Sequence, residues 1–96
     1  MADWRPELTE IDDPVAENRW SYVASDGSEK VSQIRIGRPK PLPAGKETGW
    51  YCPLLIEGHT NGIKPVMGVG PVDALMNAMI LVRRFYESVS EVEPVD

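Results

Sequence analysis

The chain has 96 residues, with 10 Lys and Arg against 15 Asp and Glu, one Cys and one His. This length favours one domain. The single Cys excludes an intramolecular disulfide framework, and one Cys with one His argues against a structural metal site. We therefore expect no metal and no cofactor. No apolar run approaches the ~20 residues of a membrane span, and the first residues do not resemble a signal peptide, which predicts a cytoplasmic protein that does not bind a membrane.

The net charge of −5 is unevenly distributed along the chain. Residues 1–17 hold six acidic residues and one Arg, and residues 87–96 hold four acidic residues and no basic one. The stretch between them has a net charge of +4. Acidic chain ends usually stay solvated, so we expect flexible segments at residues 1–13 and 91–96 on either side of one domain at residues 14–90.

Two strands are predicted at residues 15–25 and 30–37, because apolar and polar side chains alternate in both. Asp26 and Gly27 lie between them, and this pair is typical of a two-residue type I′ turn. The two strands should therefore form an antiparallel hairpin.

Residues 38–49 contain three prolines and two glycines, which predicts a long exposed loop. A third strand follows at residues 50–57, and its Pro53 indicates an edge position or a bulge. After a turn at residues 58–62, residues 63–69 should pair back as the fourth strand.

A helix is predicted over residues 71–89, because proline suits the first helical position and Asp73 complements the helix dipole. The two glycines before it, Gly68 and Gly70, indicate a tight junction between strand and helix. The expected buried stripe of the helix consists of Leu75, Met79, Val82 and Tyr86.

Together these elements predict an α+β domain, a four-stranded antiparallel meander with the C-terminal helix packed on one face. The expected buried side of the helix should cover the apolar side chains of one sheet face, which are Trp20, Ile34, Ile36, Trp50, Leu54 and Ile56. Such an arrangement leaves the second sheet face open, where we place Val23, Val31, Tyr51, Leu55 and Val66.

Surplus apolar residues point to an interaction surface. Met76 and Ile80 fall on the polar side of the helix, and Tyr51 and Leu55 fall on the open sheet face. Contiguous exposed apolar patches mark interfaces. We therefore expect a non-enzymatic protein-interaction module that forms a homodimer, with another protein as a possible partner.

Two other functions remain open. Arg35, Arg38, Lys40 and Lys46 are candidate anion-binding residues in and around the proline-rich loop, although four cations are far from the basic stripe of a nucleic-acid binder. A pocket near Cys52 and His59 would suit a small ligand or an enzyme. No catalytic set is evident around either residue, so a non-enzymatic role is favoured and no catalytic residue is assigned.

Several short motifs resemble those of a family of small bacterial proteins classed only as a domain of unknown function. The matching segments are I-G-R-P at residues 36–39, W-x-C-P-x-x-I-x-G at residues 50–58 and G-V-x-x-x-x-A-L-x-x-A at residues 68–78. The resemblance extends over residues 15–86. It implies a bacterial cytoplasmic protein, and it implies no particular activity.

Overall fold

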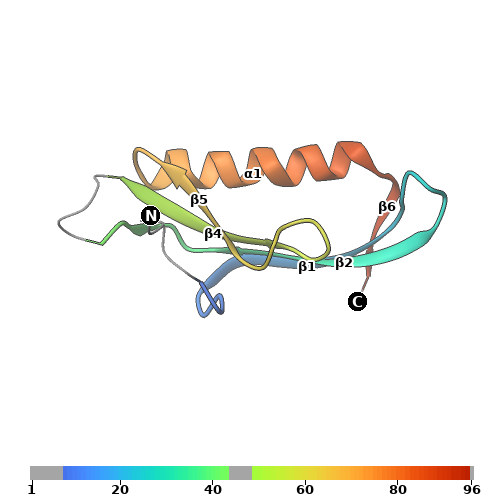
Figure 1. Ribbon diagram of the computed structural model, residues 1–96, viewed down its shortest axis with the longest axis horizontal. Coiled ribbons are helices and arrows are strands. Elements are labelled where there is room, and N and C mark those ends of the chain that lie inside the picture. Colours follow the sequence, from blue (N-terminus) through green and yellow to red (C-terminus); the bar gives the residue numbers. More distant parts are fainter. Residues whose placement is uncertain (1–7, 44–48, 96) are drawn as a thin grey trace.

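The computed structural model describes residues 8–43 and 49–95 and has one helix lying along an antiparallel, curled sheet (Figure 1). The elements in chain order are β1 (Pro14–Val23), β2 (Glu29–Gly37), β3 (Lys40–Pro41), β4 (Trp50–Ile56), β5 (Lys64–Gly68), α1 (Pro71–Ser88) and β6 (Ser90–Val95). The predicted α+β class is confirmed, and the sheet has six strands where four were expected. The molecule is elongated, at 47 × 28 × 21 Å.

The predicted meander forms the centre of the sheet. β1 pairs with β2, β2 with β4, and β4 with β5, all antiparallel. The two additional strands come from segments without a strand pattern. The two-residue β3 pairs with the start of β4, and β6 pairs with the outer edge of β1.

Strand β6 occupies residues that we expected to be a flexible tail. Its register places Trp20 opposite Pro94 and Arg19 opposite Val95, and Val92 packs against the core cluster. The end of α1 returns the chain to the edge of β1, where unpaired backbone groups are available. Asp96 lies outside the described residues.

The hairpin between β1 and β2 has a longer turn than predicted. Gly27 has a φ of +88°, whereas Asp26 is not in the left-handed region that a type I′ turn needs. The Asp26 carboxylate instead accepts hydrogen bonds from the backbone N–H and the hydroxyl of Ser28, at 2.9 and 2.6 Å, and these bonds lower its pKa. The Ala24 N–H donates a hydrogen bond to the Ser28 carbonyl and closes a three-residue loop at residues 25–27. The glycine of this loop adopts the left-handed conformation.

Helix α1 is rotated relative to the predicted orientation. Its buried side chains are Ala74, Ala78, Val82 and Phe85. Met79 and Tyr86, which we expected in the core, are 43% and 45% exposed. The expectation was wrong for these two residues, because small side chains at the contact allow the helix to approach the sheet more closely than a Leu and Met stripe would.

The contact between Gly68 and the first turn of α1 accounts for this rotation. A Cβ atom built on Gly68 would lie 2.6 Å from the Cα of Ala74 and would also overlap the Ala74 nitrogen. Gly70 has open space around its Cα. Of the two glycines, only Gly68 is required by the close approach, and it holds the Ala74 side of the helix against the sheet.

Replacing Gly68 with Ala should destabilise the protein by about 2 kcal/mol or more, because the new methyl group meets backbone atoms that cannot move independently. Urea unfolding followed by circular dichroism measures the effect. Gly70→Ala is the matched control and should change the free energy of unfolding by less than about 0.5 kcal/mol. Equal effects for both variants would contradict the close approach.

Replacing Val92 with Asp should lower the free energy of unfolding by about 1 kcal/mol or more, because a side chain packed on the core becomes charged. Glu93→Gln, on the same strand and exposed, should be close to neutral. If residues 91–96 were a flexible tail, both substitutions would leave the urea midpoint unchanged.

Candidate interaction surfaces

The solvent side of α1 carries a continuous group of exposed apolar side chains. Its five members, which we call the helix stripe, are Val69 (88% exposed), Val72 (71%), Met76 (55%), Ile80 (46%) and Met79. Arg83 follows the stripe, with its guanidinium 3.5 Å from Glu87 and 5.8 Å from the centre of the Tyr86 ring. The stripe includes both helix residues that the sequence singled out, Met76 and Ile80.

Three stripe residues were missed by the sequence analysis. Met79 was assigned to the core, and Val69 and Val72 were not considered as interface residues. The signal was present, because valines and methionines recur at three- and four-residue spacing from 69 to 79, and Ile80 follows four residues after Met76. It could be interpreted only after the rotation of α1 was known.

The other two candidate interface residues, Tyr51 and Leu55, lie on the opposite face of the molecule. They alternate along β4 with Cys52 and Leu54, which are buried under α1. Tyr51 and Leu55 are partly buried, so the four candidates belong to two separate surfaces. Val66, which we expected on the open face, is buried in the core beneath α1.

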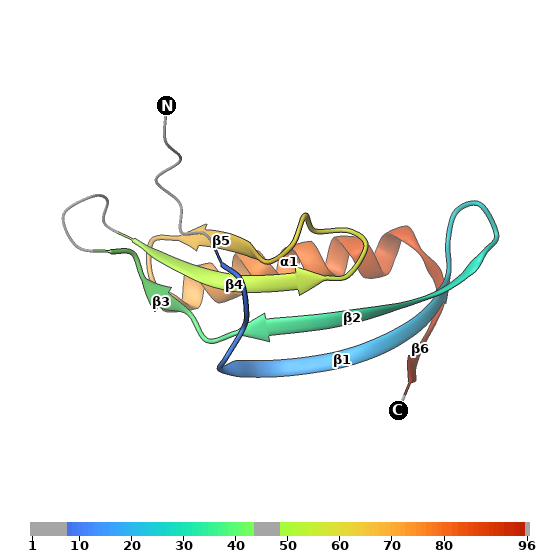
Figure 2. The same cartoon turned by 60° about the horizontal axis from the view of Figure 1, so that its bottom comes forward.

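An N-terminal segment, residues 8–13, crosses the sheet face that α1 leaves uncovered (Figure 2). We call it the strap. Ile11 is 8% exposed, and it contacts the sheet at Gly37, where a built Cβ would lie 3.0 Å from both Ile11 Cγ2 and Pro53 Cγ. Residues 8–13, which we expected to be flexible, lie against the sheet in this structure, while residues 1–7 lie outside the described part.

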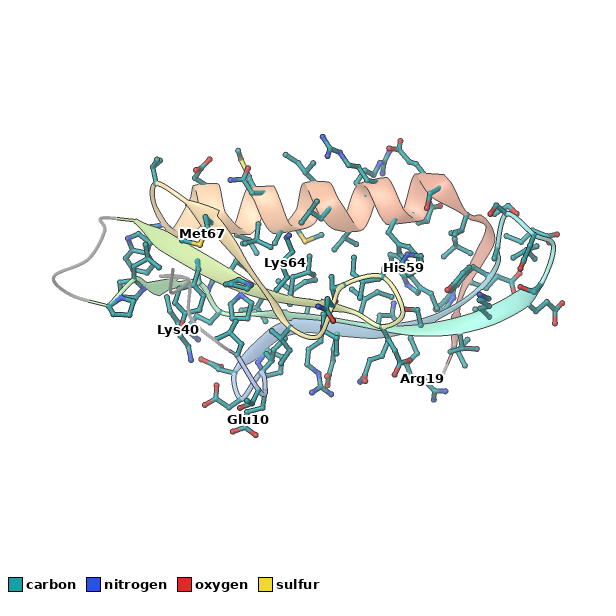
Figure 3. All side chains as sticks on the ribbon, in the orientation of Figure 1. Glu10, Arg19, Lys40, His59, Lys64 and Met67 are labelled. Atoms are coloured by element: carbon teal, nitrogen blue, oxygen red, sulfur yellow. The ribbon has the colours of Figure 1, made fainter. Side chains whose placement is uncertain are left out.

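Three of the four candidate anion-binding residues form ion pairs with residues near the N-terminus. Arg35 Nε lies 2.8 Å from a Glu17 carboxylate oxygen, and Arg38 Nε lies 2.7 Å from one of Asp13. Lys40 Nζ lies 3.5 Å from Asp12, on the face away from α1 (Figure 3). Lys46 lies outside the described residues. The acidic N-terminal segment and the basic loop, which we treated as separate features, neutralise each other.

Cys52 is fully buried against the helix. Its thiol lies 3.3 Å from the carbonyl oxygen of Gly37, and burial raises its pKa to about 11. The thiolate is the reactive form of cysteine, so this thiol is protonated and shielded at neutral pH.

His59 has a different environment from Cys52. Its ring centre is 4.2 Å from that of Phe85, and its Nε2 is 3.5 Å from the Tyr22 hydroxyl. The shallow hollow beside His59 is lined by residues that include Lys30 and Ser88, and Cys52 does not line it. The structure therefore does not join the two residues in one pocket.

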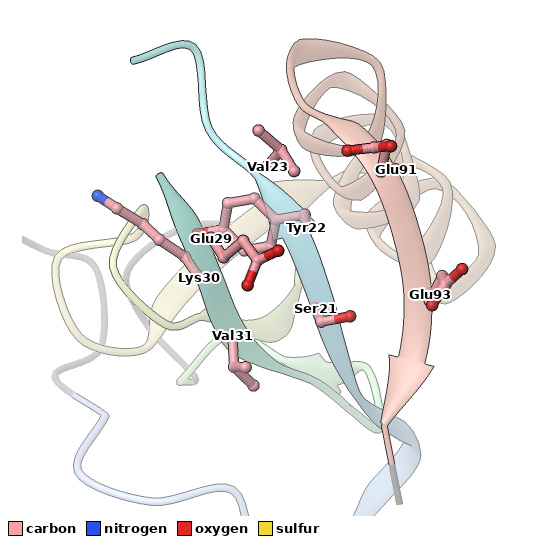
Figure 4. Close-up of a pocket in the computed structure, with 8 residues that line it drawn as sticks. All are labelled: Ser21, Tyr22, Val23, Glu29, Lys30, Val31, Glu91 and Glu93. Atoms are coloured by element: carbon pink, nitrogen blue, oxygen red, sulfur yellow. The ribbon is translucent and has the colours of Figure 1, made fainter. Parts of the chain in front are cut away.

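A second hollow lies where β1, β2 and β6 meet (Figure 4). Glu29, Glu91 and Glu93 contribute carboxylates to its lining, Lys30 contributes the one cation, and Ser21 contributes a hydroxyl. Within residues 8–43 and 49–95, no group of three or more His, Cys, Asp or Glu side chains is arranged to hold a metal ion. The lining of this hollow as described contains Ser21 and no histidine.

Comparison with protein-family models, with curated proteins and with solved structures found no match for this chain. The resemblance to a small bacterial family therefore stays a prediction. Among the described residues, no helix is long and apolar enough to cross a membrane.

The raised pKa of Cys52 predicts a loss of stability at alkaline pH. Below pH 9 the thiol is protonated in both states, whereas between pH 9 and 11 only the unfolded chain releases its proton. The free energy of unfolding should fall over this range by up to ~3 kcal/mol more in the wild type than in Cys52→Ala. Urea unfolding at several pH values measures the difference, and parallel pH profiles would contradict the burial of the thiol.

Proposed function

We propose that this protein is a non-enzymatic protein-interaction module that forms a homodimer through the helix stripe. The single observation that carries the proposal is the exposure of four apolar side chains on one side of α1, together with Val69 just before the helix. Isolated exposed apolar residues are ordinary, but a contiguous group on a small domain marks a surface that another molecule covers.

A second copy of the chain fits this surface because Met76 and Ile80 can pair with each other across a two-fold axis. With two α1 helices antiparallel and the axis at the level of Ala78, Met76 of one copy lies opposite Ile80 of the other. The same arrangement places Asp73 opposite Arg83, so opposite charges flank the pairing of Met76 with Ile80, and Val69 and Val72 lie at the margin of the contact. An isologous interface of this kind needs only one patch.

A homodimer through the helix stripe also needs a polar rim around the apolar contact. A stable interface buries roughly 800 Å² on each partner, so the stripe forms the apolar centre and Arg83, Tyr86 and Glu87 form part of a polar rim. These three side chains are exposed and follow the stripe along α1.

Two observations favour this function over the alternatives from the sequence. The thiol of Cys52 is buried and does not share a hollow with His59, which weakens the proposal of a catalytic or ligand pocket there. The cations Arg35, Arg38 and Lys40 already have carboxylate partners, which weakens the proposal of a free anion site.

Ile80→Asp should convert the dimer to a monomer, because two charged side chains would be buried at the centre of the contact. Size-exclusion chromatography with light scattering over a range of concentrations measures the mass. Val31→Asp is the matched control, since Val31 is 47% exposed but lies on β2, away from α1. The control should remain dimeric, and a wild type that stays monomeric at high concentration would disprove the proposal.

A further inference from the structure

The strap shows which chemistry the uncovered sheet face recognises. We propose that this face is a binding site for an acidic segment of another protein, in which an apolar residue precedes two carboxylates, and that residues 11–13 occupy the site in the free protein. This inference concerns the face opposite the helix stripe and does not depend on the homodimer.

The strap contacts the sheet through side chains of two kinds. Ile11 fills the notch over Gly37 and beside Pro53. The two residues that follow present their carboxylates to cations, Asp12 to Lys40 at 3.5 Å and Asp13 to Arg38 at 2.7 Å. An apolar anchor followed by two negative charges is therefore the pattern that this surface accommodates.

The attachment of the strap is weak enough to exchange. Within the described residues, its backbone makes one hydrogen bond to the sheet side, from the Arg38 N–H to the Asp13 carbonyl at 3.0 Å. Both ion pairs are exposed to solvent, and exposed pairs contribute little to stability. Ile11 is thus the principal anchor, and displacing it uncovers both the notch and the two cations.

Charge favours an acidic occupant over other ligands. When the strap leaves, Arg38 and Lys40 lose their partners, while Arg35 keeps Glu17 on the neighbouring strand β1. The freed cations Arg38 and Lys40 can each pair with a carboxylate of the incoming segment, and the apolar notch over Gly37 can accept its apolar side chain. A tethered segment competes at an effective concentration in the millimolar range, so an external segment binds weakly until the strap is displaced.

The test uses the full chain and a fluorescent peptide with the sequence of residues 8–14. The strap is weakened by the double substitution Ile11→Ser and Asp12→Asn, and binding is followed by fluorescence anisotropy. The double variant should bind the peptide at least about tenfold more tightly than the wild type, because the competing strap is removed. A peptide with Asn in place of both Asp residues should bind more weakly, because it lacks the charges that pair with Arg38 and Lys40.

Matched variants locate the site. Adding Arg38→Glu and Lys40→Glu to the double variant should abolish binding, whereas adding Arg83→Glu, on α1, should leave it unchanged. Equal affinities for wild type and double variant, no binding to either, or binding that survives both charge reversals would overturn the proposal. A wild-type dimer that disappears in the double variant would assign the face to a second copy and would also overturn it.

A measurement on the unmodified chain guards against loss of folding in the double variant. The methyl resonances of Ile11 report whether its side chain is in the notch. Titration with the unlabelled peptide should shift these resonances toward values of a solvated isoleucine, and the Asn peptide should need a higher concentration for the same shift. Unchanged resonances at millimolar peptide would count against displacement.

Discussion

The close approach of α1 to the sheet is the constraint on which the rest of the structure depends. Gly68 lies against the backbone of Ala74, and one turn later Ala78 is also fully buried. These small residues let the helix approach until Cys52 and Leu54 have no exposed surface. The contact fixes which side of the helix is buried, and therefore which side is left exposed.

The exposed apolar side of α1 follows from that rotation. A helix with Ala at the contact buries less apolar area per turn than one with Leu and Met, so the larger side chains Met76, Met79 and Ile80 remain in solvent. The aromatic end of the helix compensates, because Phe85 packs with its ring against Trp20, Tyr22 and His59. A monomer would be expected to carry charge at these exposed positions, and this departure is the basis of the proposed homodimer.

On the sheet face away from α1, charged residues from distant segments of the chain form ion pairs. Asp12 and Asp13 precede the first strand, while Arg38 and Lys40 follow the second. The hairpin of β1 and β2 brings these segments to the same end of the sheet, as the pairing of Pro14 with Gly37 shows. Ile11 is an isolated apolar residue in an acidic segment. This contrast was the available sign that the segment docks on the sheet.

The sequence by itself determined the class, the helix and the antiparallel order of its four main strands, because hydrophobic periodicity and turn residues are local properties. Tertiary structure alone decided the strand of residues 90–95, the rotation that exposes Met79, the docking of Ile11 and the separation of Cys52 from His59. Each of these features depends on contacts between residues that are far apart in the chain. A local sequence pattern does not show how strong such contacts are. The charged residues show the same division between what the sequence and what the tertiary structure decides. The sequence located the acidic ends and the basic middle, and only the fold brought the N-terminal carboxylates to Arg35, Arg38 and Lys40.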